Sequence, residues 1–433
     1  MRRLAVPLVG AFASGMVPGL VAAALAFLPT GDAAKSTFVS AAMCGMIAAS
    51  IAGGFLADRL GRVRAMRLAG WIALLATPFL CVSQLFFAFA FAGRFVQGFG
   101  LGLFSVLLPL YIAETQPDNR RGRATAFYQF SNSLGGIVGA LCGFAVAGAG
   151  LSQSVAWRLD VLMVAPILVV FLVGSHVLKA AGGPDGTCGT DGTIGTDVTG
   201  GGAMGHWRRL VLAMVVLALT SATGIGSVMH YSVTMMTEAE LTGSSANAAD
   251  AVMRVCGLVA ALLSAVFIDR RGRAFVLKIG TAGAAVTLFA AGGLFFGLKT
   301  GSVPTFAGSV PIAGLCVAVL LCLFVAFFSF GPGVCVWVVA AELLPASVRA
   351  KGMSFALLGN QIVTAAIASV FLPVASRFGY APLFFAFALA AAMYFALVSI
   401  IPMFRFLFGH KEQEYTTRTG KFISDRMTID SAV

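Results

Sequence analysis

The sequence predicts an all-α membrane protein of twelve transmembrane helices, arranged as two similar six-helix halves. Hydrophobic residues make up 59% of the 433 positions and charged residues only 11%, whereas a soluble domain carries roughly a quarter charged residues. The mean hydropathy is +0.94, and the apolar residues fall in blocks of about twenty, the length that crosses a hydrocarbon core of ~30 Å. These blocks lack the alternation of apolar and polar residues that is typical of transmembrane β-strands, so we expect helices.

Six spans precede a Gly-rich gap and six follow it. The expected spans are 5–28, 37–57, 68–90, 92–113, 123–148 and 158–178, then 208–236, 250–268, 275–298, 311–340, 353–375 and 380–404. The chain therefore divides into an N-terminal bundle (1–178), a linker (179–207), a C-terminal bundle (208–404) and a tail (405–433). The linker holds two imperfect copies of an Asp-Gly-Thr repeat, too few to stack into a calcium-binding coil, so we interpret it as flexible.

Positive charge is concentrated on one side of the predicted membrane. The formal net charge is +12, and about 23 of the 29 Lys and Arg residues fall on the side that the two termini share. This bias predicts a multi-pass protein of the plasma membrane or an organelle membrane, with both termini cytoplasmic. The excess of positive charge is explained by the orientation in the membrane and does not indicate a nucleic-acid partner. The sequence does not indicate whether the protein has a protein partner.

The cysteines and small residues inside the spans indicate packing. Seven of the eight cysteines lie in expected spans, and none shows metal-ligand spacing, so we expect no metal site and no cofactor. The run Gly135-Gly136-x-x-Gly139 in the fifth span allows two helices to approach closely. No nucleotide loop, metal cluster or nucleophile–base set is present, which argues against an enzyme.

Two charged motifs recur at matching places in the two halves. The first follows spans two and eight, as Asp58-Arg-Leu-Gly-Arg62 and Asp269-Arg-Arg-Gly-Arg273. The second follows spans four and ten, as Glu114 through Arg121-Gly122 and Glu342 through Arg349-Ala-Lys-Gly352. The copies are separated by roughly 211 to 228 residues, and such a parallel repeat of six-helix halves is typical of a transporter with alternating access.

These motifs resemble the sugar porter family of the major facilitator superfamily. Gly93-Arg94-Phe95 through Pro109, Glu114 and Arg121-Gly122 matches the family's helix 4 signature. Gly331-Pro332-Gly333 through Trp337, Glu342, Pro345 and Arg349 matches its helix 10 signature, and Trp157-Arg158 and Gln129 also fit. The resemblance implies the major facilitator fold and a carrier whose small-molecule substrate is a sugar or polyol.

The repeated charged residues are expected to form a cytoplasmic gate. A carboxylate or guanidinium near the hydrocarbon boundary costs several kcal/mol unless it is paired. Ion pairs between the two halves would close the cytoplasmic side and break when it opens. The predicted gate residues are Asp58, Arg62, Glu114 and Arg121 in the first half, with Asp269, Arg273, Glu342 and Arg349 in the second.

The resemblance also assigns a central binding site, with one departure. Gln129, Trp337 and Asn360 match family positions that contact sugar. In helix 7, where the family carries a Gln-Gln pair, an Asn and two Tyr, this chain has Thr220, Ser221, Gly226, His230 and Tyr231. A Trp of helix 11 is replaced by Gln361, so the fold assignment is stronger than the hexose assignment. The candidate substrate-binding residues are Gln129, Thr220, Ser221, His230, Trp337, Asn360 and Gln361.

The first span lacks an ionisable group in its interior, which favours facilitative transport. Proton-coupled members of the family carry an Asp in helix 1, where this chain has Ala13 to Val17. Asp160 is the one unusually placed acid, and pairing with Arg158 or Arg94 is its simplest interpretation. We therefore expect a uniporter of a hexose or polyol. The alternatives are a proton-coupled carrier of an organic anion, nucleoside or drug, and a nutrient sensor that does not transport, which the short tail disfavours.

Overall fold

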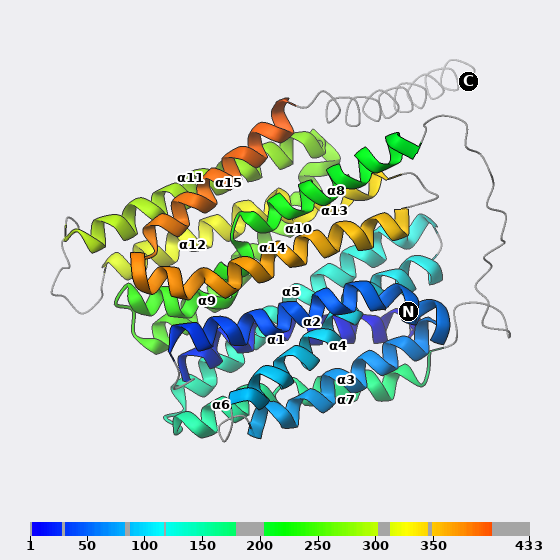
Figure 1. The fold of residues 1–433 in the computed structure, drawn as a ribbon, viewed down its shortest axis with the longest axis horizontal. Coiled ribbons are helices and arrows are strands. Elements are labelled where there is room, and N and C mark those ends of the chain that lie inside the picture. Colours follow the sequence, from blue (N-terminus) through cyan, green and yellow to red (C-terminus); the bar gives the residue numbers. More distant parts are fainter. Residues whose placement is uncertain are drawn as a thin grey trace, which may run out of the picture.

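The computed structural model describes residues 2–27, 31–82, 87–116, 118–178, 203–301, 312–344 and 349–400 (Figure 1). The expected tail and most of the expected linker lie outside these residues. Every regular element in the described ranges is a helix. Twelve stretches of these helices are long and apolar enough to cross a membrane, which confirms the predicted number of spans.

The first six spans contain seven helices. Long spans form because a chain inside a bilayer must satisfy its own backbone hydrogen bonds. The helices are α1 (Arg2–Phe27), α2 (Asp32–Leu60), α3 (Arg62–Val82), α4 (Phe87–Thr115), α5 (Asp118–Gly148), α6 (Gln153–Leu162) and α7 (Ala165–Ser175). The predicted third span, 68–90, ran too far along the chain, because Phe87 to Ala90 belong to α4.

The second six spans contain eight helices. They are α8 (Ala203–Ala222), α9 (Ile225–Glu238), α10 (Gly243–Arg271), α11 (Arg273–Lys299), α12 (Ile312–Phe330), α13 (Pro332–Leu343), α14 (Arg349–Phe378) and α15 (Ala381–Ile400). As in the first half, an Asp-Arg-x-Gly-Arg turn joins two consecutive helices. Gly61 and Gly272 occupy corresponding places in these turns, with φ of 78° and 80°. Both turns therefore need a residue without a Cβ.

Three predicted spans are interrupted, each at a residue that disfavours a continuous helix. The sixth span breaks between α6 and α7, where Pro166 occupies the first turn of α7. The seventh breaks at Gly224, whose φ of 80° lies in the left-handed region. The tenth breaks at Gly331-Pro332, because proline cannot donate a backbone hydrogen bond to the preceding turn.

Each half is a bundle, and the two bundles lie side by side (Figure 1). In the first half α1 packs on α5 and α4 packs between α2 and α3, while in the second half α11 packs on α15 and α10 on α12. The halves meet where α2 packs on α14, α5 on α10 and α1 on α9. We call the end of the molecule where α1 begins the terminal end, and the end where α1 finishes at Phe27 the loop end.

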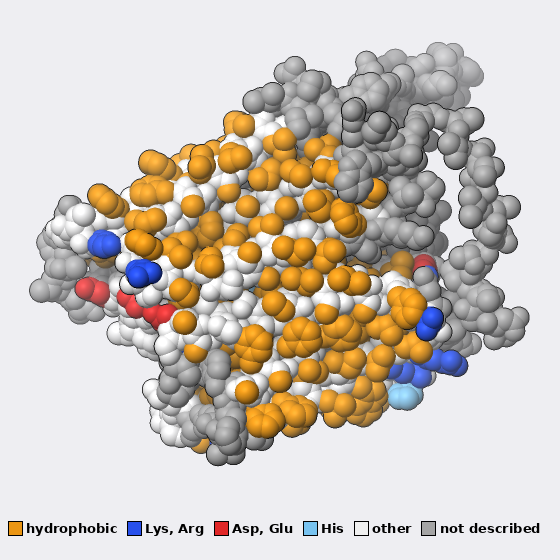
Figure 2. All heavy atoms as spheres, in the orientation of Figure 1, with side chains coloured by type: hydrophobic (Ala, Val, Ile, Leu, Met, Phe, Trp, Pro, Cys, Tyr) orange, Lys and Arg blue, Asp and Glu red, His pale blue; other side chains and the backbone are white. Residues whose placement is uncertain are grey.

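The surface of the protein is apolar along its flank and charged at its two ends, as expected for a protein that crosses a membrane. Figure 2 shows hydrophobic side chains over the flank of the helices, with charged side chains gathered at the two ends. Large hydrophobic side chains such as Trp71, Phe289 and Leu389 are exposed. In a soluble protein an apolar surface of this extent would be a site of aggregation, whereas in a bilayer it faces lipid.

Candidate functional site

The break in the seventh span brings hydroxyl groups of α8 against α14. The Thr364 hydroxyl donates to the Ser221 hydroxyl at 2.9 Å. The Asn360 amide, one turn earlier on α14, donates to the Leu217 carbonyl of α8 at 2.8 Å. Ser221 is buried and Asn360 is half-buried. The structure thus brings two predicted site residues, Ser221 and Asn360, onto one polar strip between α8 and α14.

The other predicted site residues lie in different surroundings. Thr220 is buried and its hydroxyl donates to the Val216 carbonyl at 2.9 Å, within its own helix. His230 is buried in α9 and its Nδ1 lies 2.7 Å from the Gly226 carbonyl oxygen. Gln129 of α5 is exposed, and Trp337 of α13 is 40% exposed. The amide and the indole therefore lie at the protein surface, whereas the Thr220 hydroxyl and Nδ1 of His230 are engaged within their own helices.

Gln361 reaches from the second half to the first. Its amide nitrogen lies 3.4 Å from the Met46 sulfur, near the middle of α2. Closer to the loop end, the Leu372 backbone N–H donates to the Ser36 hydroxyl at 3.3 Å. These contacts join α14 to α2 from the middle of the helices to the loop end. The halves are closed against each other along this stretch.

One ion pair of the predicted gate is present at the terminal end. Arg62 Nε lies 3.1 and 3.2 Å from the two Glu114 carboxylate oxygens, and Arg62 Nη2 lies 3.1 Å from Oε1. Arg62 Nη1 also donates to the Ala57 carbonyl at 2.8 Å. This pair joins the start of α3 to the end of α4, so it braces one half and does not bridge the two.

Among the other predicted gate residues, Arg273 has a side chain that the structure describes. Arg273 is half-buried at the start of α11. The side chains of the other predicted gate residues lie outside the part of the chain whose side chains the structure describes: Asp58, Arg121, Asp269, Glu342 and Arg349. A bridge between the two charged motifs therefore stays a prediction.

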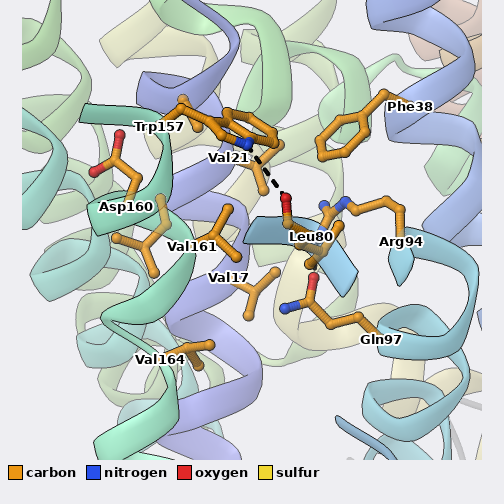
Figure 3. A pocket seen from close by; sticks show the side chains of 12 residues that line it. Val17, Val21, Phe38, Leu80, Arg94, Gln97, Trp157, Asp160, Val161 and Val164 are labelled. Carbon is orange, nitrogen blue, oxygen red and sulfur yellow. Dashed lines mark hydrogen bonds between the residues drawn. The ribbon is translucent and has the colours of Figure 1, made fainter. Parts of the chain in front are cut away.

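A small pocket within the first half holds two buried charged residues (Figure 3). The Arg94 guanidinium of α4 is hydrogen-bonded to the Gln97 amide oxygen and lies over the Phe38 ring, 5.2 Å from its centroid. On the opposite side of the pocket Trp157 donates to the Leu80 carbonyl at 3.4 Å. Nonpolar side chains of α1 complete the wall, including Val17, Leu20 and Val21.

Asp160 lines the same pocket. Its side chain is fully buried, and neither carboxylate oxygen has a hydrogen-bond partner among the residues that the structure describes. In Figure 3 it lies across the pocket from Arg94, and its carboxylate points away from the guanidinium. The expected pairing with Arg94 or Arg158 is therefore wrong for this conformation, because the Asp160 carboxylate points away from Arg94 and makes no hydrogen bond to either arginine.

Sequence reasoning missed several polar residues that packing brings together. Thr364 was not singled out, although it bonds to Ser221. A second missed group is the buried ion pair of Asp250 and Arg254, four residues apart in the eighth span. That spacing was a usable signal, because residues at i and i+4 face each other on a helix.

The arrangement of the helices defines a class of protein. Two six-helix halves that meet along a central seam are the major facilitator fold. A crystal structure of a D-xylose–proton symporter superposes with a TM-score of 0.79 and covers 91% of this chain and 96% of that chain. The sequence identity is 18%, so this likeness concerns the fold alone.

Sequence comparison identifies the family. The family described as sugar (and other) transporter matches residues 16–180 and 200–412, so the chain belongs to the sugar porters of the major facilitator superfamily. A probable polyol transporter of Arabidopsis thaliana is 25% identical over 390 residues, 81% of this chain and 72% of the relative. A D-xylose transporter of Levilactobacillus brevis is 23% identical over 412 residues, 88% of this chain and 87% of the relative.

Proposed function

We propose that the protein is a facilitative carrier that moves a neutral hexose or polyol across a membrane by alternating access. The observation that carries this proposal is the polar strip of Ser221, Asn360 and Thr364, together with the exposed Gln129 and Trp337. Hydroxyl and amide groups donate to and accept from sugar hydroxyls, and an indole face covers the apolar side of a sugar ring. The names of the related polyol and xylose transporters support the same class of substrate.

In this proposal all seven predicted substrate-binding residues line the site, but they have different roles. Gln129, Trp337, Asn360 and Gln361 contact the substrate directly. The short side chains of Thr220 and Ser221 leave more room in the site where the family's helix 7 pattern has amides. His230 forms the loop-end wall, since its ring is buried and bonded to the backbone.

The terminal end faces the cytoplasm in this proposal, since it carries most of the Arg and Lys residues. The ion pair of Arg62 and Glu114 shapes the cytoplasmic gate from one side. Its partners in the other half are the second copies of the two motifs.

Uptake into proteoliposomes tests the function. We would measure a panel of labelled hexoses, pentoses and myo-inositol, with and without an inward proton gradient. Saturable uptake that equilibrates and ignores the gradient is the expected result. A well-folded preparation that exchanges none of these solutes would refute the substrate class and leave only the fold.

A substitution at Gln129 tests the site itself. Gln129→Ala should raise the KM for the transported solute by roughly fivefold to tenfold, because a ligand hydroxyl loses about 1 kcal/mol or more of hydrogen bonding. Asn132→Ala is a matched control on the same helix, since its amide donates to the Ala11 carbonyl of α1. We expect it to lower stability and leave the KM unchanged. An unaltered KM in Gln129→Ala would remove that residue from the site.

Asp160 favours a second candidate function, a proton-coupled carrier. Ionisable groups inside membrane spans are costly and commonly lie on ion or proton pathways, and this one is buried without a partner. Under this function a proton gradient drives accumulation of the solute, and Asp160→Asn abolishes accumulation while exchange continues. Under facilitative transport both proteins only equilibrate the solute.

A further inference from the structure

A buried arginine in the eighth span lies between the two halves. Arg254 of α10 is 4% exposed, although it lies inside a membrane-spanning segment. Its Nε donates to an Asp250 carboxylate oxygen at 2.9 Å, one turn earlier on the same helix. The other Asp250 oxygen accepts a hydrogen bond from the Ser232 hydroxyl of α9 at 2.5 Å. Within this half the charge is therefore neutralised and held in one orientation.

The same guanidinium also reaches the other half. Arg254 Nη2 donates to the Met229 carbonyl of α9 at 2.8 Å and lies 3.5 Å from the Pro18 carbonyl oxygen of α1. Its Nη1 lies 3.8 Å from where a Cβ would stand on Gly136 of α5. The guanidinium therefore lies within van der Waals range of α5 as well as of α1. Arg254 thus occupies the point where α1 and α5 of one half meet α9 and α10 of the other.

The contacts of Arg254 divide unequally between the halves. Asp250, Ser232 and Met229 all belong to the second half and would move with it as a rigid body. Of its hydrogen bonds within the described residues, the one with Pro18 alone crosses the seam and must break when the loop end opens. The positive charge stays paired in both states, so opening costs one long charge-assisted hydrogen bond and does not create an isolated buried charge.

We propose that Arg254 is a latch that holds the loop end closed, and that Asp250 and Ser232 are positioning residues that aim it at the Pro18 carbonyl. The proposal rests on the alternating-access function proposed above. A latch of this size suits a carrier, because the two states must lie within a few kcal/mol for turnover. It also complements the predicted gate, which uses ion pairs at the terminal end.

The test measures the loop-end opening directly, without any substrate. Spin-labelled amino acids at Ala33 of α2 and Ser244 of α10, both exposed and one in each half, report the distance across the loop end. Arg254→Gln in lipid nanodiscs should raise the ratio of loop-open to loop-closed molecules by roughly fivefold to tenfold. This is the effect of one ordinary hydrogen bond, because the 3.5 Å distance to Pro18 is long for a bond from a charged group. Asp250→Asn should shift the ratio in the same direction, since the guanidinium loses its orientation.

A charge swap separates the latch from simple ion-pair stability. Asp250→Arg combined with Arg254→Asp keeps an i, i+4 pair but moves the guanidinium one turn away from Pro18. We expect this double variant to fold and to be loop-open as often as Arg254→Gln. If Arg254→Gln does not fold, Arg254→Lys keeps the charge but cannot reach Asp250, Met229 and Pro18 together, and should give the same shift.

The matched control is another loop-end cation that bonds a backbone carbonyl. Lys299 Nζ of α11 donates to the Phe378 carbonyl of α14 at 2.8 Å, within one half. Lys299→Gln should therefore leave the distance distribution unchanged. The proposal is overturned if folded Arg254→Gln matches the parent protein, or if Lys299→Gln shifts the ratio equally. Because no solute is present, a wrong substrate assignment leaves this test intact.

Discussion

Replacing Gly15 with alanine tests how closely α1 and α5 pack in the first half. A Cβ on Gly15 would stand 1.7 Å from the Asn132 carbonyl oxygen of α5, and that atom belongs to the backbone. The contact recurs along the two helices, since a Cβ on Gly139 would stand 2.3 Å from the Met16 carbonyl oxygen. Ordinary contact begins at 3.4 Å, so the helices would have to part locally by up to about 1.7 Å.

Separation of this size also affects two hydrogen bonds between the helices. The Ser131 hydroxyl donates to the Leu8 carbonyl at 2.7 Å, and the Asn132 amide donates to the Ala11 carbonyl at 3.2 Å. Overpacking costs about 1–3 kcal/mol and each lost hydrogen bond about 1 kcal/mol, while alanine regains about 1 kcal/mol of helix propensity. We therefore expect Gly15→Ala to destabilise the protein by about 2–4 kcal/mol.

Thermal unfolding in detergent, followed by size-exclusion chromatography, measures this effect. The midpoint should fall by roughly 5–10 °C for a half of this size. Gly293→Ala on α11 is the control, because a Cβ there would meet no atom within 4 Å. Its midpoint should stay the same or rise slightly. Equal midpoints for the two variants would show that α1 and α5 do not pack as closely as the structure has them.

Two further substitutions test the break in the seventh span and the ion pair at the terminal end. Gly224→Ala should lower both the unfolding midpoint and the transport rate, because φ is 80° and the new Cβ would stand 2.4 Å from the Phe387 ring. Gly226→Ala, which meets only Thr364 at 2.9 Å, should have a smaller effect, and the reverse order would contradict the left-handed break. Glu114→Gln should cost no more than about 1 kcal/mol, since the Arg62 and Glu114 side chains are 17% and 22% exposed. Added salt should lower the midpoint of the parent protein more than that of Glu114→Gln, and an equal salt response would mean that the pair contributes nothing.

The membrane accounts for how much of the fold could be predicted. Apolar blocks must match the thickness of the hydrocarbon core, and each must be helical to satisfy its own backbone. The number of spans and the two-half repeat therefore follow from the sequence and are confirmed by the structure and the family match. The interruptions of the spans were less visible, because Gly224 and Gly331-Pro332 lie inside stretches that are, as a whole, long and apolar enough to cross a membrane.

The candidate site was only partly predictable. The sequence identified Ser221, Asn360 and Gln361 as polar residues inside spans, but it could not say which groups they bond. Thr364 completes the strip only because α14 packs on α8, which is a contact between residues about 143 positions apart. The direction in which a polar side chain points is decided by such contacts and not by its own helix.

Composition, charge bias and repeated motifs by themselves determined that this protein crosses a membrane with twelve spans in two halves. These properties depend on local sequence and on the thickness of a bilayer. Only the tertiary structure decided the state of the charges inside the membrane. Asp250 has Arg254 one turn away and is paired, whereas Asp160 is buried with no hydrogen-bond partner in the described part of the chain. The physical reason is that the cost of a buried charge depends on what packs against it, and packing joins residues that the sequence keeps far apart.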